Sequence, residues 1–180
     1  LNINENVNQN EIYDKYVYFI NKIDDKKDIY TDKSLFNFKL IGFIKIFFPI
    51  SKIIILKRDI NNNLLSIYKN DLEAKNLGWT NDIKQITDYH TLFLDYLNFW
   101  NGLQKNLFLE ISYDDLINNP LKISKKIINY CELEWEQKCL EYYKNNDSAI
   151  DTASANQANK PIYKSSLNKF ENFKKFFNLP

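Results

Sequence analysis

Histidine, cysteine, glycine and methionine are all scarce or missing in this sequence. One histidine, His90, and two cysteines, Cys131 and Cys139, occur in 180 residues. These are too few for a metal cluster or a disulfide framework. They also leave little material for a nucleophile–histidine–acid relay. We therefore expect His90 to be structural or exposed, and both thiols to stay reduced, as intracellular thiols usually do.

Long apolar runs and a strong excess of one charge are missing as well. The longest apolar run, Ile53–Leu56, is far shorter than the ~20 residues that a membrane-spanning helix needs. The net charge is +1, from 24 basic and 23 acidic residues. We therefore expect no nucleic-acid binding through bulk charge, and any anion site must be local. Without a secretory signal pattern, the sequence predicts a cytoplasmic protein with no membrane span.

Methionine is absent even from position 1, which predicts that the sequence is not a complete reading frame. Residues 1–10 are polar, and we expect them to be disordered. The chain as a whole is 44% hydrophobic, which is enough to build a sizeable core. Length and composition together predict one domain over residues 1–180, truncated at its N-terminus.

Two runs of β-branched and apolar residues, Lys52–Lys57 and Leu107–Tyr113, are typical of parallel strands buried on both faces. A turn over Asp114–Asn119 is expected after the second run. Helices are expected over Glu11–Ile23, Phe36–Phe48, Asn61–Asn70, Asp82–Trp100, Pro120–Tyr130, Trp135–Lys144 and Leu167–Phe177. On the long helix, the aromatic residues between Tyr89 and Trp100 have the spacing of a core stripe. This alternation predicts an α/β layered fold with a parallel sheet flanked by helices.

Arg58, the only arginine, directly follows the first predicted strand. Asparagine, lysine and isoleucine are used heavily, so lysine would serve at most surface positions, and an arginine suggests that a bidentate fork is needed. Ligands of open α/β sheets bind beyond the carboxyl ends of strands, and Ser66 lies about two helical turns further on. The two side chains suit a phosphate group. The alternative is a surface ion pair of Arg58 with Asp59 or Asp82.

Two further features are ambiguous by themselves. Tyr113 ends the second predicted strand, where it would either contact a nucleotide or pack in the core. Residues 152–166 form an irregular stretch of small, hydroxyl, amide and lysine side chains. Such a loop either covers a ligand or is simply exposed.

Taken together, five segments resemble the PAPS-dependent sulfotransferases, in particular a bacterial group similar to protein-tyrosine sulfotransferases. The segments are Thr31–Phe38, Phe48–Asp59 with Ser66, Ile111–Leu116, Cys131–Trp135 and Thr152–Phe170. The resemblance implies a fold like that of P-loop kinases. It also implies an enzyme that moves a sulfuryl group from 3′-phosphoadenylyl sulfate (PAPS) to an acceptor hydroxyl, on a protein tyrosine or a carbohydrate, without a metal.

The same resemblance implies roles for individual residues. The implied nucleotide-binding residues are Arg58, Ser66, Tyr113, Ser154, Gln157, Lys160 and Lys169. Of these, Arg58 and Ser66 would bind the 3′-phosphate. Lys33, assisted by Ser154, would stabilise the sulfuryl group during transfer. This role suits a compact cation, because sulfuryl transfer, like phosphoryl transfer, depends on positioned positive charge.

One part of the family pattern has no counterpart among these residues. The family's Gly-rich phosphate loop is not found around Gly42, Gly78 or Gly102. That loop, the strand before it and the catalytic glutamate would all lie upstream of Leu1. We therefore expect a piece of a sulfotransferase that is inactive alone. The alternatives are a non-catalytic, degenerate nucleotide-binding or interaction module, and a P-loop-type transferase that uses a nucleoside triphosphate. The acceptor and the oligomeric state are left open.

Overall fold

The computed structural model describes residues 9–23, 28–69, 77–144, 160–164 and 169–176. Of residues 1–10, for which disorder is predicted, residues 1–8 lie outside these ranges, whereas Gln9 and Asn10 begin a helix, which corrects the prediction for these two residues. The chain divides into two compact units. The first contains Leu1–Ile53 and Phe93–Leu107, and the second contains Ile54–Leu92 and Phe108–Pro180. In the described part of the chain, every helix is too short or too polar to cross a membrane.

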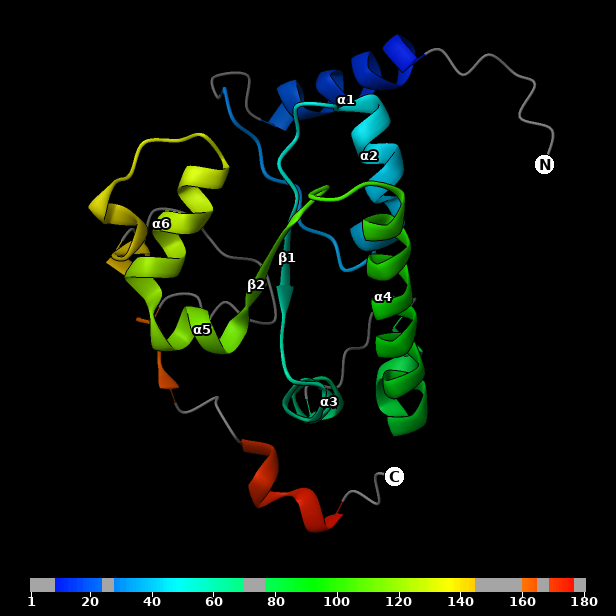
Figure 1. Ribbon diagram of the computed structural model, residues 1–180, viewed down its shortest axis with the longest axis vertical. Coiled ribbons are helices and arrows are strands. Elements are labelled where there is room, and N and C mark those ends of the chain that lie inside the picture. The colour runs from blue at the N-terminus through cyan, green and yellow to red at the C-terminus, as the bar shows by residue number, and fades with distance from the viewer. Residues whose placement is uncertain (1–8, 24–27, 70–76, 145–159, 165–168, 177–180) are drawn as a thin grey trace, which may run out of the picture. The chain divides into compact units, whose positions relative to one another are not determined.

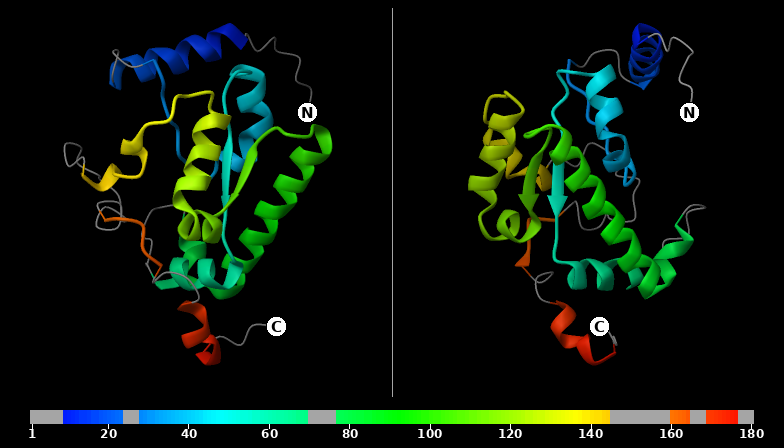
Figure 2. Two further views of the ribbon diagram at one scale, coloured as in Figure 1. Left: turned by 60° about the vertical axis from the view of Figure 1, so that its left-hand side comes forward. Right: turned by 45° about the vertical axis from the view of Figure 1, so that its right-hand side comes forward.

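The second unit is built on a parallel two-stranded sheet, which confirms the predicted α/β fold class. Its regular elements are β1 (Ile54–Lys57), α3 (Ile60–Lys69), the beginning of α4 (Ile83–Leu103), β2 (Leu109–Ser112), α5 (Tyr113–Asn118) and α6 (Pro120–Tyr130). The register places Lys57 opposite Ser112, and both arrows point the same way in Figure 1 and in both views of Figure 2. Helices α3 and α5 therefore begin at the same, carboxyl edge of the sheet.

The prediction that both strands are buried on two faces is wrong. In β1, Ile55 is 8% exposed, but Leu56 on the opposite face is 51% exposed. In β2 the buried residue is Ile111, which is paired with Leu56, whereas Glu110, paired with Ile55, is exposed. Successive side chains of a strand point to opposite faces of the sheet. On each face, therefore, one strand has a buried residue and the other strand has an exposed one. The sequence pattern missed this because both faces of β1 carry apolar residues.

Four of the seven predicted helices are confirmed, and three are replaced by shorter elements. The predicted turn over Asp114–Asn119 is helix α5, because the Ser112 hydroxyl accepts a hydrogen bond from the Asp115 amide (3.2 Å) and caps its start. In place of the helix predicted over Trp135–Lys144, the structure has two 3₁₀ turns, η3 (Gln137–Cys139) and η4 (Tyr142–Lys144).

Two other predicted helices are also replaced by shorter elements. The segment Phe36–Phe48 divides into a 3₁₀ helix, η1 (Asn37–Leu40), and α2 (Ile41–Phe47). The described part of Leu167–Phe177 contains only 3₁₀ turns, η6 (Lys169–Asn172) and η7 (Lys174–Phe176). The expectation that Phe36–Phe48 is mostly buried is also wrong, because only Phe38 and Ile41 are buried there, whereas Phe43 is 56% exposed.

The core of the first unit confirms the aromatic stripe predicted on the long helix. This unit contains α1 (Gln9–Ile23), η1, α2 and the second part of α4. Phe38 is 6% exposed and meets Phe93 and Tyr96 edge-on, with ring centroids 5.2 and 5.6 Å away. The Trp100 indole Nε1 donates to the Phe38 carbonyl oxygen at 2.9 Å. Phe93, Tyr96 and Trp100 of the stripe therefore pack in this unit, whereas Tyr89 belongs to the second unit, where its ring stacks on Trp79 with centroids 4.2 Å apart.

Gly42 in α2 gives this packing a specific test. A Cβ atom at this position would lie 2.5 and 2.7 Å from Cζ3 and Cη2 of Trp100, whose ring is held by its hydrogen bond to Phe38. We expect Gly42→Ala to lower the free energy of unfolding by about 1–3 kcal/mol, the usual cost of overpacking. Chemical denaturation would measure it. Gly102→Ala is the matched control, because no atom lies within 4 Å of its Cβ position. Equal effects of the two substitutions would contradict the packing argument.

Candidate functional site at the carboxyl edge of the sheet

Arg58 and Tyr113, the residues immediately after β1 and β2, are in direct contact. Because Lys57 is paired with Ser112, the next residue of each strand reaches the same edge of the sheet. The guanidinium carbon of Arg58 lies 4.6 Å from the centroid of the Tyr113 ring, which is cation–π geometry. Two of the predicted nucleotide-binding residues are thus brought together, and both are half-buried. Stacking on the ring limits the directions in which the guanidinium can point.

The first turn of α3 is organised by Asp59 rather than by a ligand. Its Oδ1 accepts hydrogen bonds from the backbone amide of Asn62 (3.0 Å) and from the Asn62 side chain (3.1 Å). Its carbonyl oxygen accepts from the Asn63 amide at 3.0 Å. Asp59 is therefore the N-cap of α3. Leu64, which is 1% exposed, anchors the same helix in the core, and Ser66 lies half-buried two residues further along.

The charged groups beside this edge include an ion pair and the lone histidine. Lys57 Nζ lies 2.9 Å from Glu110 Oε2 in a partly exposed pair. Burial lowers the pKa of His90, and the positive charge of Lys57 lowers it further, whereas Asp59 opposes both effects. His90 is half-buried and is mainly neutral at pH 7, because its ordinary pKa is already about 6.5. The structural role expected for it stays a prediction.

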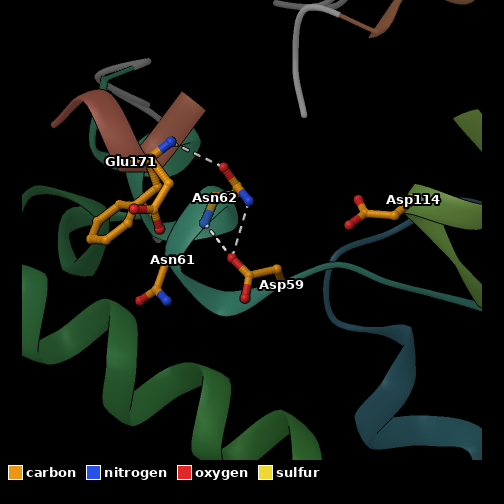
Figure 3. Close-up of a pocket in the computed structure, with 6 residues that line it drawn as sticks. Asp59, Asn61, Asn62, Asp114 and Glu171 are labelled. Atoms are coloured by element: carbon orange, nitrogen blue, oxygen red, sulfur yellow. Dashed lines mark hydrogen bonds between the residues drawn. The ribbon is translucent and has the colours of Figure 1, made fainter. Parts of the chain in front are cut away.

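A cavity of about 270 Å³ lies at the same end of the unit (Figure 3). It is lined by Asp59, Asn61, Asn62, Asp114, Phe170 and Glu171. Three of these residues directly follow predicted site residues in the chain: Asp59 follows Arg58, Asp114 follows Tyr113, and Phe170 follows Lys169. The two strand ends and the C-terminal segment therefore meet around one cavity.

The wall of this cavity is acidic. Carboxylates come from the turn after β1, from α5 and from η6, through Asp59, Asp114 and Glu171. Like charges repel an anion strongly where water is partly excluded. A phosphate group is therefore disfavoured inside the cavity itself, and an anion would have to bind on the side of Arg58. Among the described residues, no group of three or more histidine, cysteine, aspartate or glutamate side chains is arranged to hold a metal ion.

Asn62 is a site residue that the sequence reasoning missed. Its side-chain oxygen accepts a hydrogen bond from the backbone amide of Phe170 at 3.1 Å. The partner lies 108 residues away in the chain, so no local pattern could reveal this contact. The spacing of Asp59 and Asn62, typical of a helix N-terminus, was the only available signal, and it predicts a cap rather than a tertiary bond.

The remaining predicted nucleotide-binding residues are only partly covered by the structure. Lys169, in η6, and Lys160 are both exposed. The carbonyl oxygen of Lys160 accepts a hydrogen bond from the Tyr142 hydroxyl at 2.8 Å, which ties this end of the predicted loop to η4. Ser154 and Gln157 lie outside the described residues, so their roles stay predictions.

Lys33, the predicted catalytic lysine, is exposed and belongs to the first unit. Its neighbour Asp32 holds the segment through both carboxylate oxygens, which accept from the Tyr16 hydroxyl (3.1 Å) and from the Asn37 side-chain amide (3.1 Å). Burial, together with the negative charge of Asp32, raises the pKa of Tyr16, so the hydroxyl remains a donor at neutral pH. The backbone beside Lys33 is thus held from α1 and from η1.

Comparison with known proteins identifies the family of the chain. A family model described as "Sulfotransferase family" matches residues 3–137, a range that contains Lys33, Arg58, Ser66 and Tyr113. An uncharacterized protein of Aquifex aeolicus (strain VF5) is 31% identical over 163 residues, which is 89% of this chain and 21% of that relative. The chain thus spans about a fifth of the length of this curated relative. Because the family model covers most of the chain, including both strands and the residues that follow them, the chain belongs to the sulfotransferase family.

Proposed function

We propose that this chain supplies the nucleotide-binding residues of an enzyme that transfers a sulfuryl group from PAPS to an acceptor hydroxyl. The observation that carries the proposal is the contact of Arg58 with Tyr113 beyond the carboxyl ends of two parallel strands, in a chain of the sulfotransferase family. A guanidinium fork suits a phosphate, and an aromatic ring beside it suits a nucleotide. The chemistry of this donor set fits adenosine 3′-phosphate.

The roles proposed for the other residues come from the family resemblance. Ser66 on α3 would share the 3′-phosphate with Arg58, and Lys169 would add a second cation from η6. The segment with Ser154, Gln157 and Lys160 would close over the nucleotide. These assignments have in common that each contributes a neutral or positive donor to an anionic ligand.

The reaction itself requires little covalent chemistry from the protein. The bond between sulfur and the bridging phosphate oxygen of PAPS breaks, adenosine 3′,5′-bisphosphate leaves with the bonding electron pair, a new sulfur–oxygen bond forms to the acceptor, and the hydroxyl proton passes to a general base or to water. Negative charge on the bridging oxygen is stabilised by a positioned cation, and Lys33 is our candidate for it. We propose a protein tyrosine or a carbohydrate as the acceptor, with the bacterial group similar to protein-tyrosine sulfotransferases as the subfamily.

Ligand preference tests the proposal in this chain. We expect isothermal titration calorimetry to show that adenosine 3′,5′-bisphosphate binds at least about tenfold more tightly than ATP, because one good charge-assisted contact to the 3′-phosphate contributes about 1.5 kcal/mol or more. A preference for ATP would instead favour a transferase that uses a nucleoside triphosphate. Absence of binding to either nucleotide would reject the proposed nucleotide site.

Turnover separates an enzyme from a degenerate binding module. The longest polypeptide that the gene encodes would be assayed with PAPS carrying ³⁵S in its sulfuryl group and with tyrosine-containing peptides or glycans as acceptors. Transfer of label to an acceptor hydroxyl is the expected result. Nucleotide binding without any transfer would favour the non-catalytic alternative.

A further inference from the structure

Asn62 connects two parts of the second unit through its side chain. The residue lies in the first turn of α3 and is only 9% exposed. Its amide nitrogen donates to Asp59 Oδ1 at 3.1 Å, and its amide oxygen accepts from the Phe170 backbone amide at 3.1 Å. Figure 3 shows the side chain between Asp59 and the C-terminal segment. A single buried amide thus bridges the end of β1 and η6.

The segment held by this bridge has little stability of its own. Element η6 is a 3₁₀ helix of four residues, and isolated helices of this length do not persist in water. Phe170 is 4% exposed, whereas Lys169 and Glu171 beside it are exposed. The position of Lys169 therefore depends on how firmly Phe170 is fixed. The hydrogen bond that the Phe170 amide donates to Asn62 and the burial of the Phe170 ring both help to fix it.

The bridge has predicted cationic residues next to both of its ends. Arg58 precedes Asp59 by one residue, and Lys169 precedes Phe170 by one residue. We propose that Asn62 is a positioning residue, which fastens η6 to the turn between β1 and α3 and so keeps Lys169 at the same edge of the sheet as Arg58. The effect of Asn62 on nucleotide binding rests on the proposed function, whereas the attachment of η6 to the turn between β1 and α3 does not.

The acidic wall of the cavity explains why an uncharged amide suits this position. Asn62 lines the cavity together with the carboxylates of Asp59, Asp114 and Glu171. An amide side chain can donate a hydrogen bond to the Asp59 carboxylate and accept one from the Phe170 backbone amide at the same time. A carboxylate at position 62 would face Asp59 without a proton to share, and an apolar side chain would leave the buried Phe170 amide without its bond. Asparagine satisfies both partners without adding charge.

Amide hydrogen exchange tests the fastening without any nucleotide. We expect Asn62→Ala to speed exchange at the Phe170 amide by about tenfold, the loss expected when a buried hydrogen bond of roughly ordinary strength is removed. Asn61→Ala is the matched control: the same residue type, one position earlier, lining the same cavity. We expect it to change exchange at Phe170 by less than about twofold. If Asn62→Ala is unfolded, Asn62→Ser replaces it, because its shorter side chain does not reach the Phe170 amide.

A double-mutant cycle with Lys169→Ala tests the positioning role. We expect Asn62→Ala to weaken binding of adenosine 3′,5′-bisphosphate about fivefold to tenfold in the otherwise unchanged chain, but less than about twofold when Lys169 is already alanine. If the losses of binding free energy in the two single variants add up to the loss in the double variant, Asn62 does not act through Lys169. That result would overturn the positioning role.

The two measurements distinguish failure of this inference from failure of the proposed function. Unchanged exchange at Phe170 in Asn62→Ala would overturn the inference, whatever the nucleotide data show. Faster exchange in a chain whose unmutated form binds no bisphosphate would support the fastening and reject the proposed function.

Discussion

Replacement of Arg58 by alanine is expected to weaken binding of adenosine 3′,5′-bisphosphate by about 10- to 100-fold. The estimate follows from the roughly 1.5–3 kcal/mol that a hydrogen bond to a charged group contributes. The contact with Tyr113 (4.6 Å) holds the guanidinium in place before the ligand binds, so little of this energy is spent on ordering the side chain. Titration calorimetry of the variant and the unmutated chain measures the difference directly.

Two further variants distinguish the effect of the bidentate guanidinium group of Arg58 from the effect of its positive charge. Lys57→Ala removes the same unit of charge one residue earlier, from a partly exposed pair with Glu110, and we expect it to change affinity by less than about threefold. Arg58→Lys keeps the charge but loses the bidentate fork, and we expect an intermediate loss. Equal losses for Arg58→Ala and Lys57→Ala would indicate a general electrostatic effect. An unchanged affinity in Arg58→Ala would remove this residue from the site.

Replacement of Lys33 by alanine is expected to lower kcat by about 100- to 1,000-fold in the longest polypeptide that the gene encodes. Removal of one group that stabilises transition-state charge usually has an effect of about this size. Affinity for adenosine 3′,5′-bisphosphate should change by less than about threefold, because this product lacks the sulfuryl group that Lys33 would contact. Steady-state kinetics and calorimetry on the same variant provide the comparison.

Lys39→Ala is the control for the Lys33 variant. Lys39 is another lysine of the first unit, and its ammonium lies 5.4 Å from the centre of the Phe36 ring. Lys39 is half-buried, and because no role in transfer is proposed for it, we expect its variant to retain kcat within about threefold. If Lys33→Ala instead lost nucleotide affinity and kept its turnover, Lys33 would be a binding residue and not a transition-state residue.

The placement of Arg58 and Tyr113 at one edge of the sheet was foreseeable from the chain itself, whereas the stacking contact between them was not. Two apolar runs with helical segments after them indicate parallel strands, and the carboxyl ends of neighbouring parallel strands lie at one edge of a sheet. Residues that follow such strands therefore come together even when 55 positions separate them in the sequence, as Tyr113 and Arg58 are here. The same reasoning could not reveal Asn62, because its partner Phe170 belongs to a short segment whose position no periodicity predicts.

The errors in the predicted elements have a similar origin. Helix α5 was taken for a turn because acidic and asparagine residues favour turns. The Ser112 cap and the burial of Ile117, which is 7% exposed, outweigh that preference. Strand β1 was expected to be buried on both faces because it is apolar throughout, yet Leu56 is 51% exposed. Burial depends on what packs against a residue, and residue type alone does not contain that information.

By itself, the amino-acid sequence determined the α/β class, the long helices and the family resemblance, because periodicity and local motifs are properties of neighbouring residues. Only the tertiary structure decided that Arg58 stacks on Tyr113, that three carboxylates line the adjacent cavity, and that Asn62 fastens the C-terminal segment. These contacts join residues far apart in the chain, and their geometry is set by how strands and helices pack rather than by which residues follow one another.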